Sequence, residues 1–335
     1  MAEPDAITLA VVAGALDAAI REMTATMRRT AMSPVLAIGN DFSNAIFDGT
    51  PNMVLQGQDQ PVHLGGMIFA TKGVAKYFAD DLAPGDVIYH NDPLTGGSHL
   101  PDMTMYKPVF FKGELMFWTV NRSHMDETGG PLAGGYNPLA EEIWAEGLRI
   151  SPVKVYAGGK RRNDVIDFMA TNFRTRRQWL GDFGAQLASV TVAERRLLHL
   201  LEHYGSDTVR ASLQYLLNRA ERLMREEIQK MPDGEYLGRT RIESDGHGSG
   251  DMELRAIVEI RDDEMFVRLE APPTMRSYIN SYPANSIGGV YLGIVTFTDP
   301  EIPHNEGMYR PIHVDLGPKG TIVNAEEPAA CSMST

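Results

Sequence analysis

The segment of residues 89–130 constrains the fold most, because it contains the pattern of a β-hairpin between two loops rich in histidine and aspartate. Residues 103–111 and 115–120 are mostly aliphatic and aromatic, and residues 112–114 between them have the composition of a tight turn. Such a hairpin returns the chain to its starting point. The polar residues on its two sides are therefore expected to lie close together.

Two histidines and an aspartate flank this predicted hairpin. His99 and Asp102 form an H-x-x-D pair in a loop rich in Gly, Ser and Pro, and His124 comes just after the second strand. Imidazole favours zinc and its first-row neighbours, whereas a carboxylate adds affinity for harder ions such as manganese. Three protein ligands would leave a position open for water or substrate. The alternative is that these are polar loop residues that satisfy the backbone of turns, and the spacing is compatible with both interpretations.

Asp41 and His63 lie in two earlier loops. Asp41 precedes a second predicted hairpin, formed by residues 42–47 and 53–56. Its carboxylate is either a fourth metal ligand or a turn residue that caps its neighbours, and both possibilities stay open. His63, in QPVHLGGM, precedes a glycine pair and a predicted helix. We interpret it as a packing residue of its loop rather than a ligand.

A glycine-rich loop at residues 129–138 follows the hairpin, and we expect it to lie at the mouth of the same region. Glu146 and Arg149 come close to the start of the next predicted strand. They either contact a polar substrate or take part in an ion pair, and we favour the ion pair.

Composition excludes several classes of protein. The chain has 335 residues, 31 basic and 44 acidic, and a formal charge of −13, which argues against a nucleic-acid partner. Cys331 is the single cysteine, so an intrachain disulfide is impossible, as is typical of a reducing compartment. No apolar run approaches the ~20 residues of a membrane span, and the N-terminus lacks a signal-peptide pattern. We expect a cytoplasmic protein with no membrane partner.

The remaining patterns predict an α+β fold with mixed, hairpin-rich sheets and packed helices. Apolar residues recur at helical spacing in residues 5–32, 67–79, 163–203 and 206–231. After residue 233 the chain becomes rich in predicted strands, with a third hairpin between 255 and 270 and a further strand-rich stretch, GVYLGIVTFTD, at 289–299.

These patterns divide the chain into three regions. Residues 1–160 form an α+β region that carries the metal-site residues, 161–232 a helical region, and 233–335 a strand-rich subdomain. The final residues, EEPAACSMST, contain no closing helix or charged tail. We therefore expect the chain to be incomplete at its C-terminus.

Several motifs together resemble the hydantoinase B/oxoprolinase family. They include TMRRTAMSP, NDFSNAIFD, QPVHLGGM, GDVIYHNDPLTGGSHLPDMTMYKPVFFKGELMFW, SHMDETGG, EGLRISP, DGEYLGRTRIESDG and GTIVNAEEPAAC. They occur in the family's order and cover essentially the whole chain. Within the family, the DFS, H-x-x-D and SHMD elements resemble the metal subunit of caprolactamase.

This resemblance implies a metal site and a partner. The family's ligands fall on Asp41, His99, Asp102 and His124, with Zn²⁺ as the expected ion and Mn²⁺ as the alternative. The implied partner is an ATP-binding hydantoinase A-type subunit in an (αβ)₂ heterotetramer, which would use ATP and possibly bicarbonate. This chain contains no G-x-x-x-x-G-K-[ST] phosphate loop, which is consistent with ATP binding elsewhere.

The implied activity is the opening of a small cyclic amide that the partner has activated. Three further residues of the central segment are candidates for orienting the ligands or transferring protons: His90, Asp92 and, first among them, Asp126. One alternative is the metal-bearing subunit of an ATP-dependent acetone or acetophenone carboxylase. Another, of a different class, is a non-catalytic scaffold that shapes the partner's site.

Overall fold

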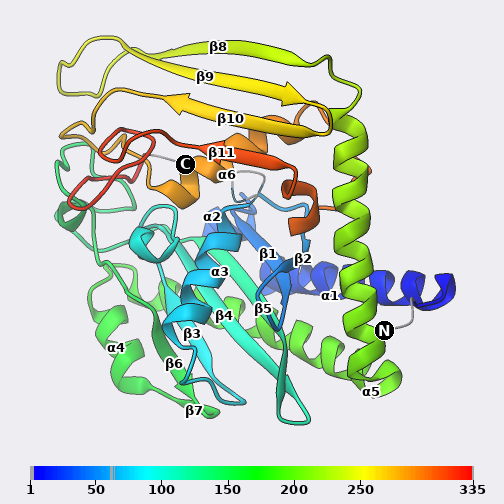
Figure 1. The fold of residues 1–335 in the computed structure, drawn as a ribbon. Helices are drawn as coiled ribbons and strands as arrows, with labels where there is room; N and C mark the ends of the chain where they lie inside the picture. The colour runs from blue at the N-terminus through cyan, green and yellow to red at the C-terminus, as the bar shows by residue number, and fades with distance from the viewer. Residues whose placement is uncertain (1–3, 61–62, 64, 334–335) are drawn as a thin grey trace.

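The computed structural model describes residues 4–60, 63 and 65–333, and its centre is a seven-stranded sheet (Figure 1). The strand order is β2-β1-β5-β4-β3-β6-β7, and all neighbouring strands are antiparallel. The strands are β1 Phe42–Asp48, β2 Met53–Gln56, β3 Val87–His90, β4 Asp102–Phe111, β5 Glu114–His124, β6 Val153–Ala157 and β7 Lys160–Arg161.

The β4–β5 hairpin confirms the pattern at the centre of the sequence. Its strands pair from Phe111 with Glu114 at the turn to Asp102 with His124 at the open end. Lys112 and Gly113 both have positive φ, 51° and 86°, as expected for a type I′ turn that matches the twist of the strands. The second strand is longer than predicted, so His124 is its last residue rather than a residue beyond it.

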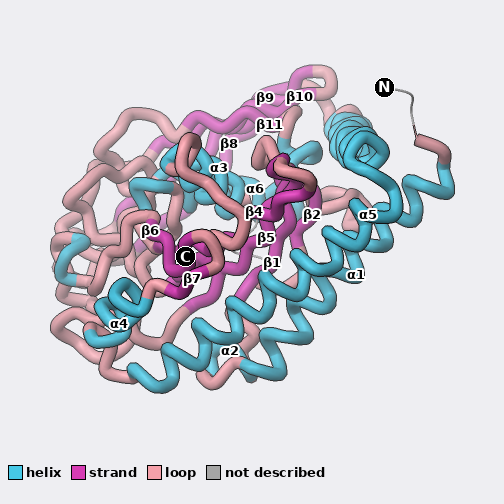
Figure 2. Tube along the Cα trace, turned by 90° about the horizontal axis from the view of Figure 1, so that it is seen from below, coloured by secondary structure: helices cyan, strands magenta, loops and turns pink. Residues whose placement is uncertain are grey.

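One face of this sheet is covered by α1 (Ala6–Thr30) and the first half of α5 (Arg176–Ile228), which lie side by side in Figure 2. The apolar stripe predicted for the first helix is the buried face of α1, and it packs in the core shared with α5 and the sheet. Gly205, inside α5, has φ of 74°, a left-handed conformation that glycine adopts without steric cost. Here the helix changes direction (Figure 1), at the boundary predicted between the two helical segments.

The other face is covered by α3 (Gly66–Tyr77), α6 (Pro283–Val295) and a second sheet. The order of this sheet is β11-β10-β9-β8; β10 and β11 are parallel and the other pairs antiparallel. Its strands are β8 Gly234–Ile242, β9 Met252–Arg261, β10 Glu264–Glu270 and β11 Ile312–Asp315. The short helices are α2 Pro34–Ala37, α4 Asn163–Thr171, η2 Pro93–Thr95, η3 Ile143–Ala145 and η4 Glu306–Tyr309.

The α+β class is confirmed, but the strand-rich prediction for residues 289–299 is wrong. Most of that segment belongs to α6, which begins with Pro283 in its first turn, a favourable position for proline. Ala284, Gly288 and Ile294 are its buried residues. Packing against α3 therefore outweighs the β-propensity of the Val, Tyr, Ile and Thr residues. In the described ranges, no helix is both long and apolar enough to cross a bilayer.

Asp182 of α5 fixes the chain between α1 and β1. Its buried carboxylate Oδ1 accepts hydrogen bonds from the backbone N–H groups of Met32, at 2.6 Å, and Ser33, at 3.0 Å. Asp182→Ala is expected to lower the free energy of unfolding by about 2 kcal/mol, because one buried and one partly buried donor lose their acceptor. Urea denaturation checks this, with Asp182→Asn as the control that keeps an acceptor oxygen. Equal stability of the alanine variant and the wild type would contradict the assignment.

Candidate metal centre

Three side chains at the open end of the β4–β5 hairpin converge on one point. His99 Nε2 lies 3.0 Å from Asp102 Oδ1 and 3.2 Å from His124 Nδ1. His124 Nδ1 lies 3.2 Å from the same carboxylate oxygen. His99 and Asp102 are fully buried, and the side chain of His124 is 11% exposed. Among the described residues, this is the group of three or more metal-ligating side chains whose donor atoms all lie within 4.8 Å of one another.

The register of the hairpin explains the convergence. Asp102 is the first residue of β4 and His124 the last of β5, and the two are directly paired. Their side chains therefore leave the same face of the sheet at its open end. His99 reaches this point from the preceding turn, which the Asp102 N–H to His99 carbonyl hydrogen bond (3.1 Å) closes. The predicted grouping of His99, Asp102 and His124 is thus brought together in the structure.

The donor chemistry of this group fits a divalent cation. His99 Nδ1 lies 2.6 Å from the carbonyl oxygen of Ser332, so that nitrogen carries the proton. Nε2 of the same ring then presents a lone pair to the Asp102 carboxylate and to His124 Nδ1. A proton shared within this set joins two of the three acceptors at a time, whereas one cation satisfies all three. Metal-binding histidines also typically donate a hydrogen bond from their second ring nitrogen to an acceptor such as a backbone carbonyl.

Electrostatics keeps the carboxylate ionised. Burial alone would raise the pKa of Asp102, but the positive charge that His99 and His63 carry when protonated, with hydrogen bonds from His124 and His63, holds this pKa well below its usual range. Burial likewise would lower the pKa of His124, yet the hydrogen bond and charge of Asp102, and the charges of Asp41 and Asp126, raise it above 6.5. The group thus combines the anionic carboxylate of Asp102 with the His124 imidazole, whose surroundings favour a bound positive charge.

His63 belongs to this group's surroundings, which the interpretation as a loop packing residue missed. His63 Nε2 lies 3.2 Å from Asp102 Oδ2, and its Nδ1 lies 3.0 Å from Ser43 Oγ. Ser98 donates a second hydrogen bond to the same Asp102 oxygen. These contacts occupy Oδ2 and leave Oδ1 directed at the two other donors. No spacing motif links His63 to Asp102, so the sequence alone contains no local signal for this contact.

Asp41 lies beside the group without joining the three donors. Its backbone carbonyl accepts the His124 N–H at 3.0 Å, so it is attached to the end of β5. Its carboxylate Oδ1 accepts a hydrogen bond from Gln60 Nε2 at 3.3 Å. Its negative charge contributes to the raised pKa of His124. A role as a fourth ligand stays a prediction.

The three other predicted residues are not among these donors and have partners or surroundings of their own. Asp126, two residues after His124, accepts a hydrogen bond from Gln178 Nε2 at 2.6 Å, and burial, followed by the charge of Asp182, raises its pKa. Asp92 caps η2 by accepting the Leu94 N–H at 3.1 Å.

His90 is fully buried, and its ring lies 5.4 Å from that of Tyr106. Burial, and then the charge of Arg122, lower its pKa to about 3, so its ring is neutral. The catalytic roles of Asp126, Asp92 and His90 stay predictions.

The glycine-rich loop at 129–138 contributes Tyr136 to the site. Its ring stacks on His124 with a centroid separation of 5.7 Å and an interplanar angle of 27°, and it lies 6.0 Å from the His99 ring. Tyr136 is 42% exposed, so it forms part of the boundary between the donors and solvent. The expected position of this loop at the mouth of the region agrees with these contacts.

Glu146 and Arg149 have separate partners. Arg149 pairs with Glu327 at 2.7 Å and lies 3.8 Å from Asp92, so the ion-pair interpretation holds for Arg149 but not for Glu146. Glu146 instead accepts backbone N–H bonds from Cys331 and Ser332 at 2.6–2.9 Å. Because the Ser332 carbonyl in turn contacts His99 Nδ1, Glu146 acts on His99 through this backbone segment.

Glu146→Ala is expected to release the segment around Ser332. Cys331 is completely buried, and burial, together with Glu146, raises the pKa of its thiol well above the usual range. The folded wild-type protein should therefore react slowly with a thiol reagent, because the thiolate is the nucleophile. The variant should react at least about ten-fold faster. Reaction of Cys331 with Ellman's reagent measures this, Glu326→Ala is the exposed control, and equal rates in all three proteins would contradict the link.

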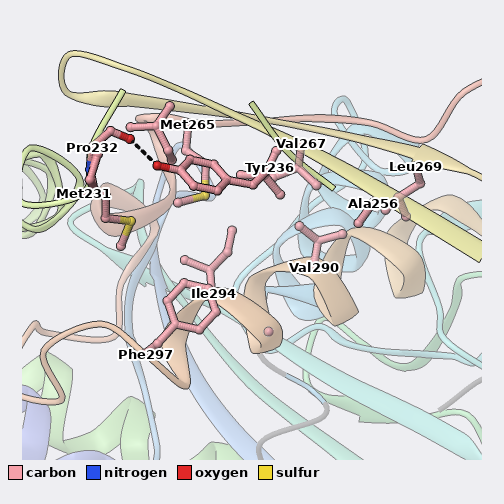
Figure 3. Close-up of a pocket in the computed structure, with 13 residues that line it drawn as sticks. Met231, Pro232, Tyr236, Ala256, Met265, Val267, Leu269, Val290, Ile294 and Phe297 are labelled. Atoms are coloured by element: carbon pink, nitrogen blue, oxygen red, sulfur yellow. Dashed lines mark hydrogen bonds between the residues drawn. The ribbon is translucent and has the colours of Figure 1, made fainter. Parts of the chain in front are cut away.

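A separate apolar cavity of about 540 Å³ lies between the second sheet and α6 (Figure 3). Side chains from β9 and β10 form one wall, and Val290, Ile294 and Phe297 form the other. The hydroxyl of Tyr236 at its edge donates to the Pro232 carbonyl at 2.7 Å. The described residues that line it include no histidine, carboxylate or cysteine, in contrast to the group at the hairpin end.

Comparison with known proteins identifies the family of this chain. The model of the Hydantoinase B/oxoprolinase family matches residues 5–335. The chain belongs to the hydantoinase B/oxoprolinase family. The resemblance inferred from the motifs is therefore confirmed. The motifs that contain Asp41, His99, Asp102 and His124 lie within the matched part of this family member.

Similar proteins are longer than this chain. It is 54% identical over 325 residues to caprolactamase subunit beta of Pseudomonas jessenii, which covers 97% of this chain and 56% of that protein. The crystal structure of ATP-dependent caprolactamase from the same organism matches with a TM-score of 0.95 and 53% identity, over 98% of this chain and 57% of that chain. This family member therefore spans about half the length of these relatives.

A nucleotide-free structure of acetone carboxylase also matches, with a TM-score of 0.90 and 20% identity, over 98% of this chain and 45% of that chain. At this identity the match shows a shared fold.

Proposed function

We propose that this chain is the metal-dependent hydrolytic subunit of an ATP-dependent lactamase of the caprolactamase, hydantoinase or 5-oxoprolinase type. The observation that carries the proposal is the convergence of donor atoms of His99, Asp102 and His124, which all lie within 4.8 Å of one another. The similarity to caprolactamase subunit beta supports a cyclic amide as the substrate. The chain would act in the cytoplasm, in an (αβ)₂ heterotetramer with an ATP-binding hydantoinase A-type subunit.

The residues that would hold the ion are His99, Asp102 and His124, with Asp41 as the fourth ligand. Zn²⁺ suits the two imidazoles, and Mn²⁺ is the alternative. When bound, such an ion supplies Lewis-acid chemistry, because it polarises a carbonyl and lowers the pKa of water. His63 and Ser98 hold Asp102 through Oδ2, and the Ser332 carbonyl holds His99 through Nδ1. These contacts keep the donor atoms pointed at the site before substrate arrives.

Asp126 is assigned the proton transfer. Asp126 comes two residues after His124, the last residue of β5, and is half-buried. Its raised pKa brings it closer to the neutral range in which a general base is most effective. Asp126 would accept the proton of the attacking water and return it to the ring nitrogen as the amide bond breaks. Asp92 caps the turn before His99, and the neutral ring of His90 lies beside Tyr106, so we assign both to the support of the ligands rather than to proton transfer.

The division of labour with a partner follows from the substrate. An unstrained lactam is a poor electrophile, so its hydrolysis is easier once ATP has been used to activate the ring, either by phosphorylation or through a bicarbonate-derived carboxyphosphate. The similarity to the structure of ATP-dependent caprolactamase supports this coupling. This chain would receive the activated ring and open it.

The test is an ATP-dependent ring-opening assay with the co-expressed ATP-binding subunit. A panel of lactams, 5-oxoproline and hydantoins is incubated with ATP and bicarbonate, and the product is identified by mass spectrometry. The proposal predicts an amino acid or carbamoyl amino acid with the mass of the ring plus water. A β-keto acid formed from acetone or acetophenone would instead identify a ketone carboxylase. Full activity of a metal-free complex would favour the scaffold alternative.

A further inference from the structure

Arg122 of β5 is a buried charge without a counter-ion. It is 1% exposed, and its Nε donates to Thr104 Oγ1 at 3.1 Å. Its Nη2 has no hydrogen-bond partner. Among the described residues, no carboxylate lies within 4.0 Å of its guanidinium. Burying an unpaired charge costs several kcal/mol, so such a group is usually found beside an anion.

The groups around Arg122 are donors rather than anions. The buried Tyr106 hydroxyl makes no hydrogen bond within 3.5 Å to a described residue, although it lies beside Thr104 and Arg122, and the charge of Arg122 acts on it and on the neutral ring of His90. Thr104 and Tyr106 lie on β4, the neighbour of β5, and His90 lies on β3, the next strand, where it pairs with Thr104. Together they form a polar recess in the layer where α3 covers the sheet.

The N-terminus of α3 faces the same guanidinium. A Cβ atom added to Gly66, the first residue of this 12-residue helix, would lie 3.4 Å from Arg122 Nη1. The N-cap residue, Gly65, provides no side-chain cap. A helix N-terminus carries a partial positive charge and directs N–H groups outward. Two positive groups thus lie close together, and an anion beside them would neutralise both.

This recess lies one row of residues from the three metal donors. Arg122 pairs with Thr104, and His124 pairs with Asp102 two residues further along the same strands. Alternate residues of a strand point to the same face, so both rows face α3, about 7 Å apart along the strands. Ser43, which contacts His63, pairs with Arg122 on its other side.

We propose that Arg122 and the N-terminus of α3 bind a small oxyanion, such as a carboxylate, bicarbonate or phosphate. The planar guanidinium offers paired N–H donors that match two oxygens of such a group, and the Tyr106 hydroxyl supplies a third donor. That this oxyanion is the anionic group of the activated substrate, or bicarbonate itself, rests on the proposed function. The binding of an oxyanion at this site is independent of the proposed function.

The test measures oxyanion binding to the whole chain after metal removal by chelation, so that anions held by a metal are not counted. Acetate, bicarbonate and phosphate are titrated separately by calorimetry and thermal denaturation in a buffer without competing oxyanions. At least one should bind saturably and raise the melting temperature of the wild type. The anion that binds most tightly identifies the source. The absence of saturable binding of all three would overturn the proposal.

Two variants locate the site. Arg122→Met should weaken binding by about a hundred-fold or more, because it removes the charge and the paired donors. It should fold at least as well as the wild type in oxyanion-free buffer, since it replaces an unpaired buried charge with an apolar group of similar length. Gly66→Ala keeps the charge but puts a methyl group in the recess, and should weaken binding by about ten-fold. Undiminished affinity in both variants would overturn the proposal.

Two controls separate this inference from the proposed function. Arg196→Met removes an exposed arginine that pairs with Glu22 and should bind the oxyanion as the wild type does. Asp102→Asn should lose metal but keep oxyanion binding. If the ring-opening assay fails while the wild type still binds an oxyanion through Arg122, the site stands and the proposed lactamase function does not.

Discussion

Asp102→Asn is expected to lower the metal affinity of the chain by about a hundred-fold or more and to reduce ring opening to background. The substitution keeps the shape of the side chain but removes the negative charge that faces His99 and His124. Loss of a residue that only hydrogen-bonds to a metal ligand typically lowers metal affinity or activity about 10- to 100-fold. Loss of a ligand itself should lower them further. Competition with a chromophoric chelator measures the affinity, and elemental analysis measures the bound metal.

The matched control is His203→Ala. His203 is an exposed histidine of α5 whose Nδ1 contacts the His199 carbonyl of its own helix. It has the same chemistry as the proposed ligands but lies outside their group. The control should bind metal and turn over substrate as the wild type does. Wild-type metal content and activity in Asp102→Asn would show that the carboxylate is no ligand.

Acidification from about pH 8 to about pH 5.5 is expected to weaken metal binding by about ten-fold for each pH unit below the pKa of His124. The hydrogen bond and charge of Asp102, followed by the charges of Asp41 and Asp126, outweigh burial and raise this pKa above 6.5. A proton therefore competes with the metal at His124 already near neutrality. Asp102 stays ionised over the whole range, because its pKa is well below the usual value.

Stability of the metal-free chain should respond with the opposite sign. Because the folded pKa of His124 is raised, its protonation stabilises the fold fully below the unfolded value of 6.5, and this contribution is lost as the pH rises through the folded pKa. The rise in melting temperature caused by metal should consequently grow with pH over the same interval. Thermal denaturation with and without zinc checks both curves. A metal affinity that stays constant between these pH values would contradict His124 as a ligand.

The core of the site could be predicted because it depends on local pattern. Two apolar runs around a short turn fix a hairpin, and a hairpin brings the residues at its two ends together whatever else the fold does. His99, Asp102 and His124 follow from that alone. Similarly, apolar residues at helical spacing located α1 and both halves of α5. In these elements the local pattern and the tertiary packing favour the same structure.

The other contacts depend on packing between distant segments. His63 reaches Asp102 from a loop before α3, and Ser332 reaches His99 from the far end of the described chain. Neither contact leaves a spacing signal in the sequence. The prediction of a strand in the α6 segment was wrong for a related reason. Its branched and aromatic residues favour a strand in isolation, whereas burial against α3 selects a helix.

Anomalous X-ray scattering from crystals grown with zinc tests the central claim most directly. Diffraction data collected just above and below the zinc absorption edge locate the ion independently of the fit of the protein. We predict one strong peak about 2.0–2.2 Å from His99 Nε2, Asp102 Oδ1 and His124 Nδ1, which are zinc–nitrogen and zinc–oxygen bond lengths. A crystal that contains zinc by fluorescence but shows its peak elsewhere, with these three side chains as they are here, would contradict the account.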